Sequence, residues 1–499
     1  MNTFVEKMEA IEKVVEHLKR TENGAMAYDT TFYKVYDMFA FGGAYRQRTD
    51  EECIALFSSA FNEEPILATK CLFYLRDVRG GQGERRFFRV CFNWLCQKYS
   101  RVARKLLPFV AEYGRWDDLI HTTYHTSVWG DAMAIVADQL SEDIDTSYPS
   151  LLAKWLPSEN CSSLETKQMA KAVRTYFGWT PRQYRKLLSE LRRRLNVVER
   201  LMSANEWDKI EFDKLPSKAG LLYKDAFARR DIIKDRYREF VLSDHTKVNA
   251  DTLFPYEIVS KALDVYNDPI AEAALDKYWK NLPNYFDGKE NSMICVCDTS
   301  GSMTWGAGAA EPIDVAISLS IYAAEHNTGA FKDRFISFSE RPVFHTITGD
   351  TIVKKAKSIY DKSEVASTNL EAVFDLLRRG CINHQWNPED MPKTLVIISD
   401  MEVNMGVDEF NWGQTNADLV PLMEQIRHKW IADGLEAYYP NLIYWNVNAR
   451  NNTVLDLGEN VSYVSGCTPI LFEQIIRGKR GYDLMMDKLL SERYERITF

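Results

Sequence analysis

The segment CDTSGSM, residues 297–303, brings oxygen-bearing side chains together directly after an apolar run. Asp298, Ser300 and Ser302 stand at alternate positions, and Gly301 allows the backbone to turn between the two serines. Carboxylate and hydroxyl oxygens, with no His or Cys among them, are hard ligands of the kind that octahedral Mg²⁺ prefers. The segment therefore predicts a site for Mg²⁺ or another divalent cation.

Two further oxygen donors follow in later segments. Thr368 stands in ASTNLEA, just before a predicted helix, and Asp400 ends the apolar run TLVIISD. In a mainly parallel sheet, the loops at the carboxyl ends of the strands line the crevice in which ligands bind. We therefore expect five side chains to converge on one cation: Asp298, Ser300, Ser302, Thr368 and Asp400.

The same residues also allow other interpretations. Asp and Ser at a strand-to-helix turn can cap the helix that follows, and Asp400 can be an ordinary strand-end cap. A phosphatase nucleophile needs a second carboxylate two residues after Asp298, where Ser300 stands. Because no nucleophile, base and orienting group recur at recognisable spacing, we expect a protein that is not an enzyme. Glu402 and Asn404 are expected as surface residues at the rim of the crevice.

Short apolar runs alternate with amphipathic segments in the C-terminal part of the chain. The runs are residues 292–298, 333–339, 341–347, 394–400, 441–447 and 460–466. The amphipathic segments lie near residues 312–325, 350–362, 370–381, 416–432 and 469–478. This alternation predicts a doubly wound, mainly parallel sheet with helices on both faces. The second and third runs are too close for a crossover helix, so one antiparallel edge strand is expected.

The first 280 residues predict one helix after another. Residues 57–77, 84–99, 101–114 and 184–202 show apolar side chains at three- and four-residue spacing, and short breakers such as RGGQGE separate such segments. This pattern favours a HEAT-like solenoid or an array of helical pairs. The polar stretch 281–292 suits a linker. The expected fold class is α plus α/β, with a helical domain at residues 1–288 and an α/β domain at residues 289–499.

The net charge of −9 lies entirely in the C-terminal part. Residues 1–290 hold 43 basic and 43 acidic side chains, whereas residues 291–499 hold 19 and 28. Within the neutral part, residues 167–200 carry ten Lys and Arg against two Glu. Such a stretch is a candidate phosphate track, and Arg76, Arg79, Arg85, Arg86 and Arg89 form a second one.

We select ten basic residues as candidate RNA contacts: Lys171, Arg174, Arg182, Arg185, Lys186, Arg192, Arg193, Arg194, Arg85 and Arg86. Aromatic side chains interleave with the first track and could stack on unpaired bases: Tyr176, Phe177, Trp179 and Tyr184. The alternative is that the arginines form a solvated or ion-paired helix face while the aromatic rings fill the core. The segment Arg115–Trp116–Asp117–Asp118 is expected to form a structural turn with an Arg–carboxylate pair.

The pattern D-x-S-x-S, followed by a Thr in a loop before a helix and an Asp after a hydrophobic strand, resembles the metal-ion-dependent adhesion site of von Willebrand factor A domains. The resemblance implies that Ser300, Ser302 and Thr368 bind the metal directly. It implies further that Asp298 and Asp400 bind the metal directly or through water. One coordination position would then remain open for a carboxylate of a partner.

A helical array followed by such a domain is similar to the architecture of the Ro autoantigen and its bacterial relatives, the TROVE family. The segments FGGAYRQR, FYLRDVRGGQGERRFF and EYGRWDDLI carry this resemblance, and they resemble most closely an uncharacterised Ro-like family of microbial, phage and plant proteins. In Ro proteins a ring of helices takes single-stranded RNA ends on a positive inner surface. The resemblance implies a protein that binds single-stranded, misfolded or small non-coding RNA and that carries Mg²⁺ in its A domain.

A different class of function also fits the sequence. The metal site could capture an acidic protein partner while the helices only support it, in which case the protein would be an interaction scaffold without RNA. No apolar run approaches the roughly 18 residues that span a bilayer, and the N-terminal segment lacks the continuous apolar core of a signal peptide. We therefore expect a cytoplasmic protein with no membrane partner.

Overall fold

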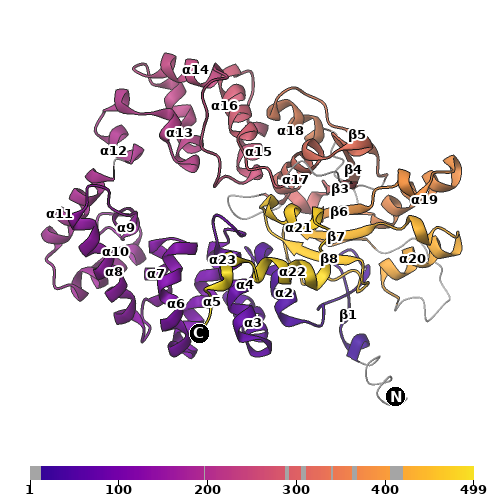
Figure 1. Cartoon of the computed structure of the whole chain (residues 1–499), viewed down its shortest axis with the longest axis horizontal. Coiled ribbons are helices and arrows are strands. Elements are labelled where there is room, and N and C mark those ends of the chain that lie inside the picture. Colours follow the sequence, from indigo (N-terminus) through magenta and orange to yellow (C-terminus); the bar gives the residue numbers. More distant parts are fainter. Residues whose placement is uncertain are drawn as a thin grey trace. The chain divides into compact units, whose positions relative to one another are not determined.

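The computed structural model describes residues 13–195, 197–286, 292–304, 311–338, 341–361, 368–404 and 420–499. The chain divides into two compact units. The sheet unit comprises Met1–Thr49 and Leu253–Leu489, and the helical unit comprises Asp50–Thr252 and Leu490–Phe499 (Figure 1). The α plus α/β class is therefore confirmed. The units differ from a simple division at residue 288, because both residues 13–49 and residues 253–286 pack with the sheet.

The sheet has six strands in the order β5-β4-β3-β6-β7-β8. Their bounds are β3 Met293–Asp298, β4 Arg334–Phe338, β5 Phe344–Thr346, β6 Thr394–Ser399, β7 Asn441–Asn446 and β8 Val461–Ser465. All neighbouring pairs are parallel except β4 and β5, so the antiparallel edge strand is confirmed. Every residue of β3, β6 and β8 is buried, as expected for parallel strands that are covered on both faces.

Helices of the sheet unit follow the predicted alternation. Their bounds are α17 Pro312–His326, α18 Ile352–Tyr360, α19 Leu370–His384, α20 Leu422–Ala432, α21 Phe472–Ile476 and α22 Gly481–Leu489. The predicted helix at 416–432 begins at Leu422 within the described residues, and residues 416–419 lie outside them. α17 is buried over nearly its whole length and contacts β3, β4 and β6, so it forms part of the core.

The two flanking segments of the sheet unit were not expected in it. The strands β1 (Leu18–Arg20) and β2 (Met26–Tyr28) form a short antiparallel pair, and helix α2 (Lys34–Phe41) packs against β8. Helices α15 (Pro255–Leu263) and α16 (Pro269–Lys280) pack against α18, and α15 also contacts α17. Ala25, Ala27 and Phe41 are almost fully buried, so these segments contribute to the core of the sheet unit.

The helical unit consists of consecutive helices joined by short turns (Figure 1). Its helices are α3 Asp50–Glu63, α4 Pro65–Arg76, α5 Arg85–Lys98, α6 Ser100–Tyr113, α7 Trp116–Thr123, α8 Trp129–Asp145, α9 Leu152–Trp155, α10 Leu164–Tyr176, α11 Pro181–Arg194, α12 Val198–Ser203, α13 Ser217–Arg229, α14 Lys234–Leu242 and α23 Glu492–Glu495. No helix among the described residues has the length and apolar character needed to cross a membrane.

Two predicted helical segments are each divided in the structure. Residues 57–77 cover the end of α3 and all of α4, because Pro65 begins a new helix and holds Glu64 outside helical geometry at φ −140° and ψ 88°. Residues 184–202 cover α11 and α12. The apolar spacing predicted the helical faces correctly but did not show where the helices break.

The last ten residues return to the helical unit. Arg493 makes a bidentate ion pair with the buried carboxylate of Asp77, in which Nη2 lies 2.7 Å from Oδ1. The buried Tyr494 donates its hydroxyl to Asp77 at 3.0 Å and stacks on Tyr113 at 5.8 Å between ring centroids. These contacts fasten the C-terminal segment to α4 and α6.

Candidate metal centre and candidate nucleic-acid interface

The candidate metal residues lie where neighbouring parallel strands end. Asp298 is the last residue of β3, and Asp400 directly follows β6, which pairs with β3. The backbone carbonyl of Thr368 accepts a hydrogen bond from the N–H of Asn404 at 2.9 Å, which places the start of α19 beside the loop after β6. Strand ends and one loop-to-loop hydrogen bond therefore bring the three predicted segments together.

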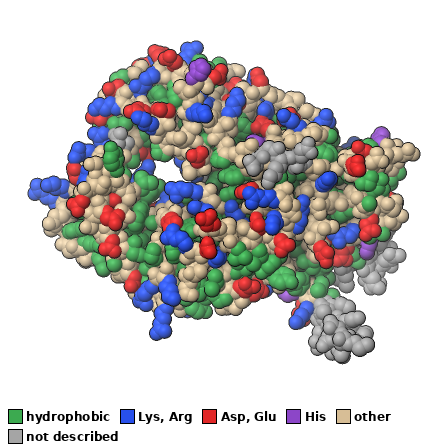
Figure 2. Space-filling view, viewed as in Figure 1, with side chains coloured by type: hydrophobic (Ala, Val, Ile, Leu, Met, Phe, Trp, Pro, Cys, Tyr) green, Lys and Arg blue, Asp and Glu red, His purple; other side chains and the backbone are tan. Residues whose placement is uncertain are grey.

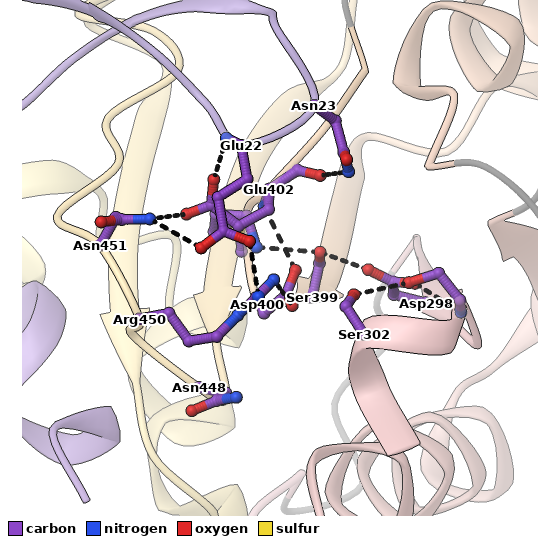
Figure 3. A network of polar contacts seen from close by, with 12 residues as sticks. Glu22, Asn23, Asp298, Ser302, Ser399, Asp400, Glu402, Asn448, Arg450 and Asn451 are labelled. Atoms are coloured by element: carbon purple, nitrogen blue, oxygen red, sulfur yellow. Dashed lines mark hydrogen bonds and ion pairs between the residues drawn. The ribbon is translucent and has the colours of Figure 1, made fainter. Parts of the chain in front are cut away.

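Asp298 is fully buried among hydroxyl and amide groups. Its Oδ1 accepts the N–H of Ser300 at 2.9 Å, and its Oδ2 accepts the hydroxyl of Ser399 at 2.5 Å. The hydroxyl oxygens of Ser300 and Ser302 lie 3.1 Å apart (Figure 3). These contacts orient three oxygen-bearing side chains toward one another at the end of β3.

Among the described residues, Asp298 makes no ion pair with a positively charged side chain. Burial, followed by the negative charge of Asp400, raises the pKa of Asp298 from 3.8 to about 7. A buried carboxylate whose ionised form is disfavoured is stabilised by a nearby positive ion. Asp298, Ser300, Ser302 and Thr368 therefore fit a hard divalent cation such as Mg²⁺, which would supply that charge.

Asp400 has a different environment, because it already has a cationic partner. Its Oδ2 accepts a hydrogen bond from Nη2 of Arg450 at 2.8 Å, and its Oδ1 accepts the N–H of Glu402 at 3.2 Å (Figure 3). A carboxylate held in this way suits an outer position, reached through a metal-bound water, better than direct ligation. Within the described residues no cluster of three or more His, Cys, Asp or Glu side chains is arranged to hold a metal.

The expected position of Glu402 was wrong. Its side chain is completely buried, not on the surface. Its carboxylate accepts the N–H of Glu22 at 2.7 Å, the amide of Asn451 at 3.1 Å and the hydroxyl of Thr453 at 3.3 Å. Glu402 thus joins the N-terminal segment and the loop after β7 to the loop after β6. Asn404 is half-buried and forms an antiparallel bridge with Gly24.

Several candidate RNA contacts in the helical unit are used in its own structure. Arg192 donates to the carbonyls of Ala153 and Leu156 and to the hydroxyl of Ser158, at 2.8–2.9 Å. Arg194 donates to the carbonyls of Ile144 and Thr146 at 2.9 and 2.7 Å, which satisfies the C-terminal end of α8. The guanidinium groups of these two arginines thus bind backbone acceptors within the helical unit, a use that neither sequence interpretation included.

Other candidates are held in ion pairs. Arg174 lies 2.8 Å from the carboxylate of Glu159, Arg193 lies 2.7 Å from Glu190, and Arg86 pairs with Asp50. In the second proposed track, Arg76 and Arg89 both donate to the buried Asp118. The predicted Arg–carboxylate turn is confirmed, since Arg115 pairs with Asp117 at 2.8 Å.

The remaining candidates are exposed cations for which the described residues supply no hydrogen bond or ion pair. They are Lys171 on α10, Arg182, Arg185 and Lys186 on α11, and Arg85 at the start of α5. The exposed Lys167 lies four residues before Lys171 and hence on the same face of α10. Basic side chains project at the edge of the molecule where α11 lies (Figure 2). The spacing of the three α11 residues places them on one helix face.

The four aromatic residues near the first basic track also differ in their exposure. Tyr184 is fully buried and donates its hydroxyl to the carbonyl of Pro157 at 2.8 Å. Trp179 stacks on Phe177 at 4.5 Å between ring centroids. Tyr176, at the end of α10, is 46% exposed. Of the four rings, Tyr176 is the one that presents most of its surface to solvent, next to the exposed cations of α10.

Comparisons with known proteins place this arrangement in a family. The model of the domain of unknown function DUF2828 matches residues 21–174 and 141–303, which together cover more than half of the chain. The chain belongs to the DUF2828 family. A second domain of unknown function, DUF7788, matches residues 292–489. The chain is also similar to the uncharacterized protein L728 of Acanthamoeba polyphaga mimivirus, at 33% identity over 489 residues, covering 89% of this chain and 81% of that protein.

The two family models meet at the candidate metal centre of this DUF2828 protein. The DUF2828 match ends at residue 303 and the DUF7788 match begins at residue 292, so both include Asp298, Ser300 and Ser302. The DUF2828 match also begins at residue 21, which assigns the segment after β1 to the same family unit.

Three residues that contact the candidate metal centre of this DUF2828 protein, or its edge, were missed from the sequence. Ser399 and Arg450 contact the two aspartates directly, and Glu22 contacts Arg450. A signal existed for the first two, because Ser399 ends the apolar run of β6 and Arg450 follows that of β7, the neighbouring parallel strand. No sequence pattern indicated Glu22, because its partner Arg450 lies 428 residues later in the sequence.

Proposed function

We propose that this DUF2828 protein is a non-catalytic RNA-binding protein of Ro-like architecture, with an Mg²⁺-binding domain of von Willebrand factor A type. The RNA would be single-stranded, misfolded or small non-coding RNA. The observation that carries this proposal is the face of α10 and α11, where five exposed cations make no hydrogen bond or ion pair with the described residues: Lys167, Lys171, Arg182, Arg185 and Lys186. Phosphate groups are the ligands that such a face attracts.

Salt-dependent RNA binding tests the proposal. The triple variant Arg182→Gln, Arg185→Gln, Lys186→Gln would be compared with the native protein by filter binding to a structured RNA with a single-stranded 3′ tail. We expect the slope of log K against log salt to fall by about 2 in magnitude, since each lost contact to a single strand contributes about 0.7.

A matched control removes the same charge elsewhere on the helical unit. Lys209, Lys214 and Lys234 are exposed but engaged in ion pairs three residues apart with Glu206, Glu211 and Asp231. Their replacement by Gln should leave the slope close to the native value. Equal slopes for the two triple variants would exclude the α11 face as the RNA site.

Metal binding is tested separately by titration calorimetry with MgCl₂. Asp298→Asn and Ser300→Ala should each abolish measurable Mg²⁺ binding, because they remove a charge and a ligand from a small site. Asp350→Asn, which removes an exposed carboxylate paired with Lys354, serves as the control. Undiminished Mg²⁺ binding by the Asp298 and Ser300 variants would place any cation elsewhere.

A second function is favoured by one specific contact. The carboxylate of Glu22 lies at the edge of the candidate metal centre, 2.6 Å from Nη1 of Arg450. An edge that accommodates one carboxylate suits the capture of an acidic partner protein through the metal centre. This function does not require RNA, and it can coexist with RNA binding by the helical unit.

A further inference from the structure

The segment Thr21–Gly24 lies along the loop that follows β6 and is held there through its backbone and polar side chains. Glu22 donates its N–H to the carboxylate of Glu402 at 2.7 Å, and Asn23 donates its amide to the carbonyl of Glu402 (Figure 3). Thr21 donates its hydroxyl to the carbonyl of Val403 at 2.6 Å, and Gly24 forms an antiparallel bridge with Asn404. The segment is the turn that joins β1 to β2, and the tip of this turn docks on the loop edge.

Glu22 is the charged contact of this segment. Its carboxylate accepts hydrogen bonds from Nη1 of Arg450 at 2.6 Å and from the amide of Asn451 at 3.2 Å. The same guanidinium donates through Nη2 to Asp400 at 2.8 Å. Arg450 thus connects Glu22 to the candidate metal centre, and Figure 3 shows Glu22, Arg450 and Asp400 in one continuous network.

The segment is attached in a way that permits its release. The side chain of Glu22 is 45% exposed, and Asn23 is also exposed. The apolar anchor of the N-terminal region begins only at Ala25, which is completely buried, and continues through β2. Residues 22–24 can therefore leave the loop edge without opening the core of the sheet unit, at the cost of polar contacts that water replaces.

We propose that Glu22–Gly24 is an internal acidic ligand of this edge, and that an acidic partner binds by displacing it. The partner is a peptide segment whose carboxylate takes the place of Glu22 on Arg450 and Asn451. Its backbone pairs with Asn404 as Gly24 does. The inference rests on the proposed capture of an acidic partner and adds its regulation: the edge is closed until a segment with a better-placed carboxylate competes.

The test uses the full-length protein and a capped hexapeptide of the chain's own residues 19–24, KRTENG. Binding of the labelled peptide would be measured for the native protein and for Glu22→Gln. Loss of the internal carboxylate should make the edge more available, so the peptide should bind roughly fivefold more tightly to Glu22→Gln than to the native protein. The variant Glu16→Gln, at an exposed position outside the segment, should bind as the native protein does.

Two further arms identify the receptor. The peptide with glutamine in place of Glu22 should bind neither protein measurably, and Asn451→Ala in the Glu22→Gln background should weaken binding of KRTENG. Tryptic cleavage after Arg20 supplies a readout without added peptide, and it should be several-fold faster in Glu22→Gln than in Glu16→Gln. Equal peptide affinity for native protein and Glu22→Gln, or equal binding of the acidic and glutamine peptides, would overturn the inference.

All binding measurements would be made in MgCl₂ and in EDTA. The two conditions distinguish failure of the internal-ligand inference from failure of the proposed partner capture on which it rests. If the peptide binds more tightly to Glu22→Gln than to the native protein, and by the same factor in MgCl₂ and in EDTA, the internal ligand is supported. The same result would show that partner capture does not need the metal. Peptide binding that depends on Mg²⁺ but is identical in the two proteins would retain the capture function and reject the internal ligand.

Discussion

Asp298 in the sheet unit and Asp118 in the helical unit are both completely buried, and they differ in what surrounds them. Asp118 in α7 receives hydrogen bonds from Arg76 and Arg89, at 2.6 Å for the shortest contact with each. Burial opposes its ionisation, but these two positive charges outweigh burial and lower the pKa of Asp118. Asp298 receives hydrogen bonds from the hydroxyl of Ser399 and the N–H of Ser300, and burial together with the charge of Asp400 raises its pKa.

The difference separates a structural carboxylate from a candidate binding carboxylate. The network around Asp118 is complete within the chain, because two arginines and the N–H of Arg115 fill its acceptor positions. The described residues around Asp298 supply hydrogen bonds but no ion pair, and Asp400 adds a negative charge. A charge that the chain itself does not balance is what a site for an external cation requires.

The largest expected change in stability comes from removing Asp118 and with it the hydrogen-bond network that Asp118 forms with Arg76 and Arg89. Asp118→Ala leaves Arg76, which is 2% exposed, buried without its partner, and we expect a loss of about 3–5 kcal/mol of unfolding free energy in urea titrations. The control is Asp131→Ala, which breaks the exposed pair with Arg104 and should cost less than about 1 kcal/mol. Similar losses for both variants would mean that burial does not distinguish the two pairs.

Substitution of Asp298 is expected to increase the stability of the metal-free protein, whereas substitution of Asp118 decreases stability. Asp298→Asn keeps hydrogen-bonding capacity and removes the unbalanced charge, so it should stabilise the metal-free protein at pH 8 by about 2–4 kcal/mol. Because the pKa of Asp298 is raised from 3.8 to about 7 in the folded state, the unfolded state loses this proton first as the pH rises. The native protein therefore loses stability between these two pH values, and the variant does not lose this contribution.

Thermal unfolding in EDTA from pH 4 to pH 8 measures this effect. The difference in Tm between Asp298→Asn and the native protein should be small near pH 4 and largest at pH 7 and above. A variant that is less stable than the native protein at pH 8 would show that another group already balances the charge of Asp298.

The smallest expected changes in stability concern two neighbouring arginines, one of which is held by the chain's own structure while the other is exposed. Arg192→Ala removes three hydrogen bonds to backbone and hydroxyl oxygens and should cost about 2 kcal/mol. Arg193→Ala removes only an exposed pair with Glu190 and should change stability by less than about 0.5 kcal/mol. Chemical denaturation of the two variants checks the prediction, and equal losses would contradict it.

The candidate metal centre was largely predictable because local sequence determines it. Apolar runs of six or seven residues predict strands, and parallel strands bring their carboxyl ends to one edge, so Asp298 and Asp400 had to lie near each other. The contact between Arg450 and Asp400 depends on side-chain direction in a loop, and sequence spacing does not determine that direction. The place of Glu22 depends on pairing over a very long sequence separation, which no local pattern reveals.

The basic stretch shows a limit of charge counting. Arg192, Arg193 and Arg194 are adjacent and identical in the sequence, yet their guanidinium groups meet backbone carbonyls, an exposed carboxylate and the end of another helix. A count of positive charges cannot show which of them are used internally. Helix spacing places Arg182, Arg185 and Lys186 on one face of α11, and the described residues supply no hydrogen bond or ion pair to them.

The bridges of Gly24 to Asn404 and of Tyr28 to Val454 have a consequence for how this chain is made. The ribosome adds roughly 5–20 residues per second, so the N-terminal strands would wait on the order of 20–80 seconds for their partners to be synthesised. The helical unit likewise lacks Arg493 and Tyr494 until residues 490–499 are synthesised. Both units therefore depend on residues that are synthesised late, and a nascent chain stalled before residue 400 would expose the apolar strand Met26–Tyr28 to chaperones.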